Sequence, residues 1–173
     1  MGDRSIAAVT SRSHSEGSWY RAQLTSFDLR SGERRTLFAP ADQIGVPAGS
    51  PSGRTIAIIE AVCSDRLIVA GELRLIDVAS GKVRNIDTAR VDVTHVAWRN
   101  ERQLAFIGHR AFETVIGEVD IETGESSEQW SSQERTFGNW YPSIWPLASG
   151  GYVGRRRSLR CGAGNRDGSR RSL

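Results

Sequence analysis

Three histidines in this 173-residue sequence could act as general bases near neutral pH: His14, His95 and His109. A histidine supports nucleophilic catalysis only when it lies beside a nucleophile and an acid orients its ring. The sequence offers no pattern of serine or cysteine with a carboxylate that would define such a triad. His95 lies in the alternating segment 94–98, which predicts a strand and a structural or surface role. His109 follows a predicted strand and begins a loop, which in some folds faces a substrate.

Three carboxylates could be mistaken for a catalytic or metal-binding set: Asp28, Asp77 and Asp120. Each occupies the same place in a recurring segment, where its side chain can accept hydrogen bonds from the backbone N–H groups of the following turn. We therefore expect a structural role for all three. The sequence also has no acidic cluster at metal-ligand spacing and no His-x-x-x-His pair. We predict no catalytic, cofactor-binding or metal-ligating residue in this chain.

The two cysteines, Cys63 and Cys161, lie 98 residues apart. They form neither a CxxC metal motif nor a dense disulfide framework. Cys63 follows an apolar segment without a neighbouring histidine, so we expect a small buried or loop residue rather than an activated thiolate.

The elements that must position these residues are organised by a repeat. Residues 26–33, 75–82 and 118–125 each contain an apolar residue, Asp, an apolar residue, any residue, Ser or Thr, Gly and a polar residue. The glycines at 32, 81 and 124 set periods of 49 and 43 residues. The pattern predicts a hairpin in which the aspartate ends one strand and the glycine supplies a positive φ in the turn.

A second element alternates with the first. Residues 48–59, 96–107 and 143–153 each predict a short strand, a polar tight turn and an apolar strand. Together the two elements give four short strands per period, which is the content of one β-propeller blade. Residues 7–10 predict the second strand of a blade whose start is missing. The sequence thus predicts an all-β fold of four-stranded propeller blades, in an incomplete propeller of three to four blades.

The charge of the chain is uneven. The net charge is +3, but residues 155–173 alone contain seven arginines and one aspartate, which leaves residues 1–154 with a net charge of −3. We expect residues 1–154 to form the incomplete propeller and residues 155–173 to be a disordered, Arg-rich tail. The break within a predicted blade favours a tail produced by a shifted reading frame. The alternative is a basic arm that associates with RNA or a membrane.

Two motifs carry a resemblance to known propellers. Residues 50–57, Ser-Pro-Ser-Gly-Arg-Thr-Ile-Ala, resemble the S-P-D-G-K-x-I-A turn of Tol-type proteins and of the N-terminal propeller of prolyl oligopeptidase family serine peptidases. Residues 76–81, Ile-Asp-Val-Ala-Ser-Gly, resemble the l-D-x-x-t-G hairpin of the same propellers. The resemblance covers residues 5–154. No Gly-His and Trp-Asp pair marks each period, which disfavours WD-repeat propellers. Residues 98–106 and 140–142 favour the peptidase propellers, with Tol-type repeats as the near alternative.

The resemblance implies a function without chemistry of its own. In the peptidase family the propeller covers a hydrolase domain and selects peptide substrates by size. This chain has no G-x-S-x-G nucleophile motif, because residues 49–53 have Pro51 at their centre. We therefore expect the gating portion of such a peptidase, catalytically inert alone, with the hydrolase domain of the parent protein as its partner. The alternative is a Tol-like, non-enzymatic propeller that binds protein partners.

Three further expectations concern partners and location. No run approaches 18 consecutive apolar residues, so no membrane span is predicted, and the N-terminus lacks the apolar core of a secretory signal, which predicts a cytoplasmic protein. Nucleic acid is not an expected partner of residues 1–154, because the basic charge belongs to the tail. The aromatic residues Trp130, Trp140, Tyr141 and Trp145 could stack on a ligand, but we expect them to pack between blades.

Overall fold

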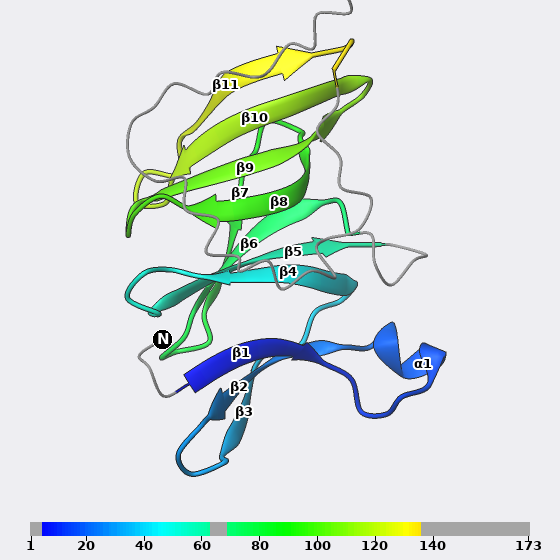
Figure 1. The fold of residues 1–173 in the computed structure, drawn as a ribbon, viewed down its shortest axis with the longest axis vertical. Coiled ribbons are helices and arrows are strands. Elements are labelled where there is room, and N and C mark those ends of the chain that lie inside the picture. Colours follow the sequence, from blue (N-terminus) through cyan, green and yellow to red (C-terminus); the bar gives the residue numbers. More distant parts are fainter. Residues whose placement is uncertain (1–4, 63–68, 136–173) are drawn as a thin grey trace, which may run out of the picture.

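The computed structural model of this chain describes residues 5–62 and 69–135 (Figure 1). These residues form eleven strands and one short helix. The strands are β1 (Ser5–Thr10), β2 (Gln23–Asp28), β3 (Arg34–Phe38), β4 (Gln43–Gly49), β5 (Thr55–Ala61), β6 (Glu72–Asp77), β7 (Val83–Ile86), β8 (Asp92–Trp98), β9 (Gln103–Arg110), β10 (Glu113–Asp120) and β11 (Ser126–Ser132); the helix is α1 (Glu16–Trp19). No helix in the described parts of the chain is long and apolar enough to cross a membrane.

The strands form three antiparallel sheets in which each strand pairs with the next one along the chain. The first sheet has the order β1-β2-β3, the second β4-β5-β6-β7, and the third β8-β9-β10-β11. The sheets stack on one another with a progressive twist (Figure 1). We call them the first, second and third blade. The prediction of an all-β fold with four-stranded blades is confirmed, and the first blade begins at its second strand, as expected for residues 7–10.

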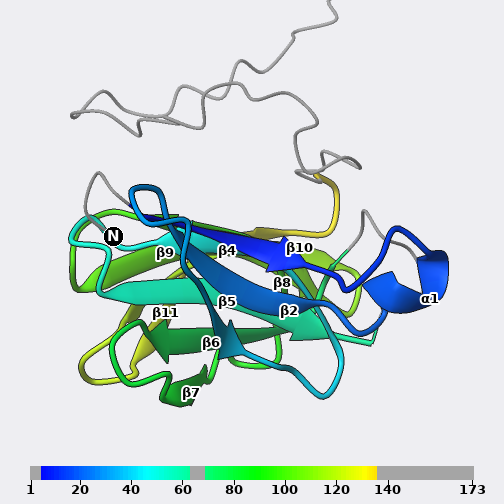
Figure 2. The same ribbon diagram turned by 90° about the horizontal axis from the view of Figure 1, so that it is seen from below.

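The predicted Asp–Gly hairpins connect the last two strands of each blade. The glycines at 32, 81 and 124 have φ values of 73°, 73° and 79°. The backbone N–H of each donates to the carbonyl oxygen of the aspartate four residues earlier, at 2.8–2.9 Å. These turns lie at one end of the strands, and α1 lies at the other end (Figure 2). The helix was not predicted, because four residues are too few to show a helical periodicity.

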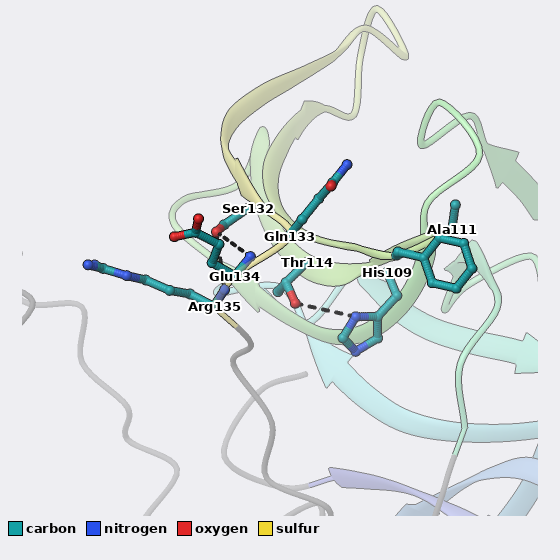
Figure 3. A pocket seen from close by; sticks show the side chains of 8 residues that line it. His109, Ala111, Thr114, Ser132, Gln133, Glu134 and Arg135 are labelled. Atoms are coloured by element: carbon teal, nitrogen blue, oxygen red, sulfur yellow. Dashed lines mark hydrogen bonds between the residues drawn. The ribbon is translucent and has the colours of Figure 1, made fainter.

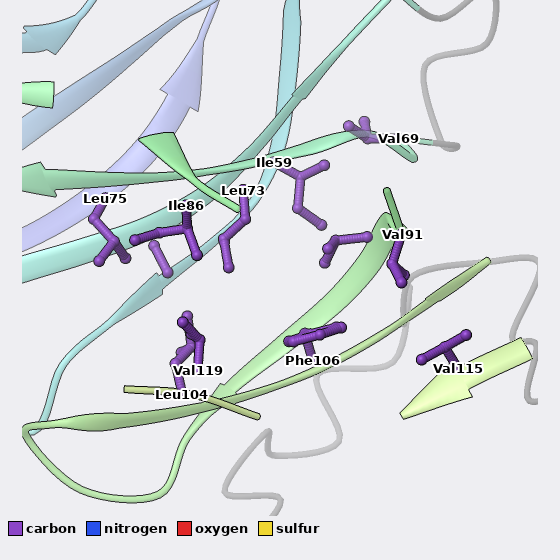
Figure 4. Close-up of a cluster of buried hydrophobic side chains, with 12 residues drawn as sticks. Ile59, Val69, Leu73, Leu75, Ile86, Val91, Leu104, Phe106, Val115 and Val119 are labelled. Carbon is purple, nitrogen blue, oxygen red and sulfur yellow. The ribbon is translucent and has the colours of Figure 1, made fainter. Parts of the chain in front are cut away.

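The core consists of two apolar layers between successive blades. Strand β5 contributes to both, because its side chains alternate between the two faces of the sheet. Ile56 and Ile58 pack in a cluster with Leu24 of the first blade, whereas Ala57 and Ile59 pack against the third blade (Figure 4). Burying one such side chain stabilises the fold by about 1.5–3 kcal/mol, so these layers hold the blades together.

Side-chain hydrogen bonds add to this packing between blades. The indole Nε1 of Trp98, at the end of β8, donates to the carbonyl oxygen of Ala48 in β4 at 2.9 Å. The guanidinium of Arg35 donates to the carbonyl oxygens of Val78 and Ala79, in the Asp–Gly turn of the second blade. Arg84 makes the same contact one blade further on, with the carbonyl oxygen of Ile121.

Several sequence-based predictions lie outside the described residues. They concern Cys63 and Cys161, the aromatic residues Trp140, Tyr141 and Trp145, the repeat copy 143–153, and the tail 155–173.

Candidate functional site

A polar hollow of about 260 Å³ lies at the end of the third blade, beside the β9–β10 turn (Figure 3). His109 and Thr114 line it from β9 and β10, Phe112 from the turn, and Ser132, Glu134 and Arg135 from the end of β11 and the residues after it. It therefore gathers an imidazole, hydroxyls and ions of both signs in one place, which makes it the candidate site in this part of the chain.

The hydrogen bonds of the hollow do not form a catalytic triad. The hydroxyl of Thr114 and Nδ1 of His109 lie 3.5 Å apart, at the limit of a hydrogen bond. The Ser132 hydroxyl accepts the backbone N–H groups of Glu134 and Arg135, at 3.1 and 3.2 Å, so it caps a turn. Among the described residues no carboxylate is hydrogen-bonded to His109, so nothing holds its ring as a general base. The arrangement can bind a small polar group, but it is not built to activate a nucleophile.

The corresponding place in the second blade differs from the hollow in its strand pairing. Gly71 stands six residues before Asp77, as Thr114 stands six before Asp120. The backbone of Gly71 exchanges two hydrogen bonds, of 3.0 and 2.8 Å, with Val93, which belongs to the inner strand of the next blade. In the third blade Thr114 pairs with Ser132 of the longer strand β11 instead. At the hollow, β11 therefore takes the place that Val93 of β8 takes beside Gly71 in the second blade.

The remaining histidines, His95 and His14, lie outside the hollow. His95 lies in β8, and its Nδ1 is 3.3 Å from the Thr94 hydroxyl. Burial lowers the pKa of the His95 imidazole, which favours the neutral ring. His14 is exposed in the connection between β1 and β2. The structure does not bring His14, His95 and His109 into a shared site.

Each of the three recurring aspartates accepts hydrogen bonds from the turn that follows it. Asp28 accepts the backbone N–H groups of Arg30 and Ser31, and Asp77 accepts both the N–H and the hydroxyl of Ser80. The hydrogen bonds from Ser31 and Ser80 lower the pKa of Asp28 and Asp77 respectively.

Asp120 differs in having a cationic partner as well. Partial burial would raise the pKa of its carboxyl group, but the hydrogen bond from Arg102, at 2.5 Å, and those from the turn outweigh burial and lower it. Among the described residues, no group of three or more His, Cys, Asp or Glu side chains is placed to hold a metal ion.

Two features of the structure were not found from the sequence. Glu60 is only 6% exposed; it accepts the N–H of Ala41 at 3.0 Å and pairs with Arg74 at 2.7 Å. A single acidic residue at the end of the apolar run 56–59 was the available signal. Phe112 is 92% exposed at the tip of the β9–β10 turn, and no sequence pattern distinguished it from a core residue.

Comparisons with known proteins show which known folds the described blades resemble. The chain matches no protein-family model and no curated protein. It is similar to a solved oligogalacturonate lyase in complex with manganese, at 17% identity and a TM-score of 0.58, covering 75% of this chain and 39% of that one.

Two further similar structures have the fold anticipated from the repeat motifs. A putative TolB from Agrobacterium tumefaciens matches at 14% identity and a TM-score of 0.57, covering 74% of this chain and 46% of that one. Acylaminoacyl peptidase from Pyrococcus horikoshii matches at 16% identity and a TM-score of 0.56, covering 76% of this chain and 24% of that one. The chain spans less than half the length of each of these three proteins.

The class of the protein follows from the blades and these likenesses together. The described residues form β-propeller blades, in an incomplete propeller. More particularly, its blades have the fold of the propellers in acylaminoacyl peptidase, tricorn protease and TolB, which confirms at the level of fold the resemblance carried by residues 50–57 and 76–81.

Proposed function

We propose that this chain is the propeller portion of a serine peptidase of the prolyl oligopeptidase family, where it gates access of peptides to a separate hydrolase domain. The observation that carries this proposal is the repeated pair of motifs at residues 50–57 and 76–81, on blades whose fold matches an acylaminoacyl peptidase. The described residues contain neither a G-x-S-x-G motif nor a histidine held by a carboxylate. The chain is therefore proposed to be catalytically inert alone.

A Tol-like interaction propeller is the second candidate. The fold likeness to TolB supports this candidate as strongly as the fold likeness to acylaminoacyl peptidase supports the first one. The exposed apolar residues Val62 and Phe112, which are 82% and 92% exposed, also support it, because both follow the second strand of a blade and so lie at one end of the molecule. Contiguous exposed apolar patches are typical of protein-binding sites, and these two side chains lie at the end of the molecule where such a patch would form.

One experiment separates the two candidates. Antibodies against residues 23–132 would be used on extracts of the source cells after treatment with a fluorophosphonate probe, which labels active-site serines. The peptidase proposal predicts a probe-labelled polypeptide, larger than 19.0 kDa, that the antibodies recognise. A recognised polypeptide without probe label would contradict the peptidase proposal and support the Tol-like alternative.

We also propose that the protein is cytoplasmic. Fractionation of the same extracts tests this: recovery of the antibody-reactive polypeptide in the periplasmic or secreted fraction would contradict it.

A further inference from the structure

The second and third blades each present three apolar side chains to the blade before them. These residues occupy the same positions relative to the hairpin aspartate: one precedes it, one follows it, and one lies in the neighbouring strand. They are Ile56, Ile76 and Val78 in the second blade and Leu104, Val119 and Ile121 in the third. All six belong to the apolar layers between the blades or pack against them, so these positions form the interface between successive blades.

The first blade has apolar residues at the same three positions, on the face that points away from the second blade. Ile6 pairs with Phe27, which precedes Asp28, and Leu29 follows this aspartate. Ile6 and Leu29 are 49% and 59% exposed, and none of the three apolar side chains belongs to an apolar cluster of the described residues. The free face of the first blade therefore has the composition of a blade interface.

The third blade, at the other end of the stack, has a matching free face (Figure 1). Its apolar residues are Ala105, Ile107 and Ile116, all of which are partly buried. In register they are equivalent to the three residues of the second blade that pack on the third blade and are completely buried, Ala57, Ile59 and Leu73. The third blade thus offers the kind of surface that covers a face like that of the first blade.

The two free faces belong to blades of opposite charge. Residues 5–38 contain five arginines and three acidic residues, a net charge of +2. Residues 92–132 contain three arginines and eight acidic residues, a net charge of −5. Because opposite charges attract and like charges repel, the first blade of one copy is matched to the third blade of another copy and not to a second first blade.

The edge of the interface shows the same complementarity at single residues. Between the first and second blades, Arg35 donates to the carbonyl oxygens of Val78 and Ala79. Counted from the turn glycines, the counterpart of Arg35 in the third blade is Ser127. Counted from the hairpin aspartates, the counterpart of Ala79 in the first blade is Arg30. The arginine therefore lies on the other side of the interface when a first blade meets a third blade.

The third blade has an acidic hollow at the position where that arginine would enter. This second hollow, of about 400 Å³, is lined by Ser127 together with Glu118 and Glu125. Glu118 pairs with Ser127 across β10 and β11, and Glu125 lies two residues before it, so all three lie on one side of the sheet. Arg30 is exposed in the turn of the first blade.

We propose that two copies of this chain join head to tail, with the first blade of each copy packed on the third blade of the other. Arg30 of each copy then lies in the second hollow of the other, beside Glu118 and Glu125. Closed propellers have roughly four to eight blades, and the described blades of two copies number six, so two such interfaces close a ring with twofold symmetry. The proposal rests on the blade repeat and is independent of the peptidase function.

The first test is the mass of the full chain in solution, measured by sedimentation equilibrium over a range of protein concentrations. A dimer of twice 19.0 kDa is expected. Leu29→Glu places a negative charge in the interface, opposite the acidic third blade, and should raise the dissociation constant at least about tenfold. Val62→Glu is the matched control, because Val62 is 82% exposed and lies outside both faces, so its variant should dimerise like the original chain.

Charge reversal identifies the two surfaces that meet. Arg30→Glu and Glu125→Arg should each raise the dissociation constant at least about tenfold, because each variant alone places like charges in both interfaces. An equimolar mixture of the two variants should dimerise about as tightly as the original chain, because in the mixed dimer each interface again joins opposite charges. Recovery in the mixture also shows that both variants are folded.

Four results would overturn the proposal. The first is a monomer at every concentration, and the second is growth beyond the dimer as the concentration rises, which would mean that the interfaces build an open filament. The third is a dimer that is weakened neither by Leu29→Glu nor by the charge reversals, which would place the contact elsewhere. The fourth is a mixture of the two charge-reversal variants that dimerises no better than either variant alone.

Discussion

Glu60 and Arg74 form an ion pair inside the second blade, with 2.7 Å between Oε2 and Nε. The same carboxylate accepts the backbone N–H of Ala41, in the connection between the first and second blades. At the equivalent positions the first blade has Thr10 and Thr25, whose hydroxyls lie 2.7 Å apart. One position in the repeat thus holds a charged pair in one blade and a neutral pair in another, and the charged pair also anchors the connection between blades.

Removal of the Glu60 carboxylate should destabilise the chain strongly. Glu60→Ala leaves the Arg74 guanidinium, which is 17% exposed, without its buried partner, and we expect a loss of about 3 kcal/mol in the free energy of unfolding. Urea denaturation measures this. The matched control is Glu72→Ala, because Glu72 pairs with the same arginine but is 69% exposed, and its loss should be below about 1 kcal/mol. Equal losses would contradict a special role for Glu60.

The hairpin aspartates should make stability depend on pH in the acid range. The hydrogen bonds of the folded turns lower the pKa of Asp28 and Asp77 below the ordinary value of 3.8, so their ionised forms stabilise the fold above that pH. This stabilisation is lost as the pH falls from about 4 through the lower folded pKa values. Asp77→Asn should lower the melting temperature near pH 7 and weaken its decline below about pH 4. A parallel decline in both proteins would contradict the assignment to Asp77.

The Trp98 hydrogen bond can be separated from the packing of its ring. Trp98→Phe removes the donor to Ala48 and keeps an aromatic ring, so we expect a loss of about 1 kcal/mol. Trp98→Ala also removes the ring from the core between the blades, and the loss should reach about 3 kcal/mol. Both are measured by urea denaturation. A Trp98→Phe variant as stable as the original chain would show that the hydrogen bond adds nothing to the packing.

Gly117 should tolerate no larger side chain. A Cβ atom at this position would lie 2.3 Å from Cζ of Phe106, which is 3% exposed and cannot turn into solvent. Gly117→Ala is therefore expected to cost about 1–3 kcal/mol through overpacking, measured as a shift in the thermal unfolding midpoint. Gly17→Ala is the control, because an added Cβ there has no neighbour within 4 Å. Unchanged stability of Gly117→Ala would mean that the Phe106 ring can move aside.

The blade repeat was predictable because its determinants are local. A hairpin depends on the few residues between Asp77 and Lys82, and the positive φ of Gly81 is a property of that one residue. Alternation along residues 73–78 likewise predicts a strand with one face buried. These signals recur at a fixed spacing, so the sequence alone identified the fold class and the first strand of the chain as part of a blade.

The tertiary structure decided which side chains meet within the blades and between them. The contact of Arg74 with Glu60, the hydrogen bond from Trp98 to Ala48, and the packing of Phe106 on Gly117 join residues that no local pattern connects. The same is true of the backbone of β4, where a bulge places Val46 at a φ of 55°, outside the usual range for a β-branched residue. The sequence predicted no catalytic site, and the polar residues around His109 come together only through the pairing of β9, β10 and β11. Such contacts depend on the register and stacking of whole strands, so they are determined only when the blades pack together.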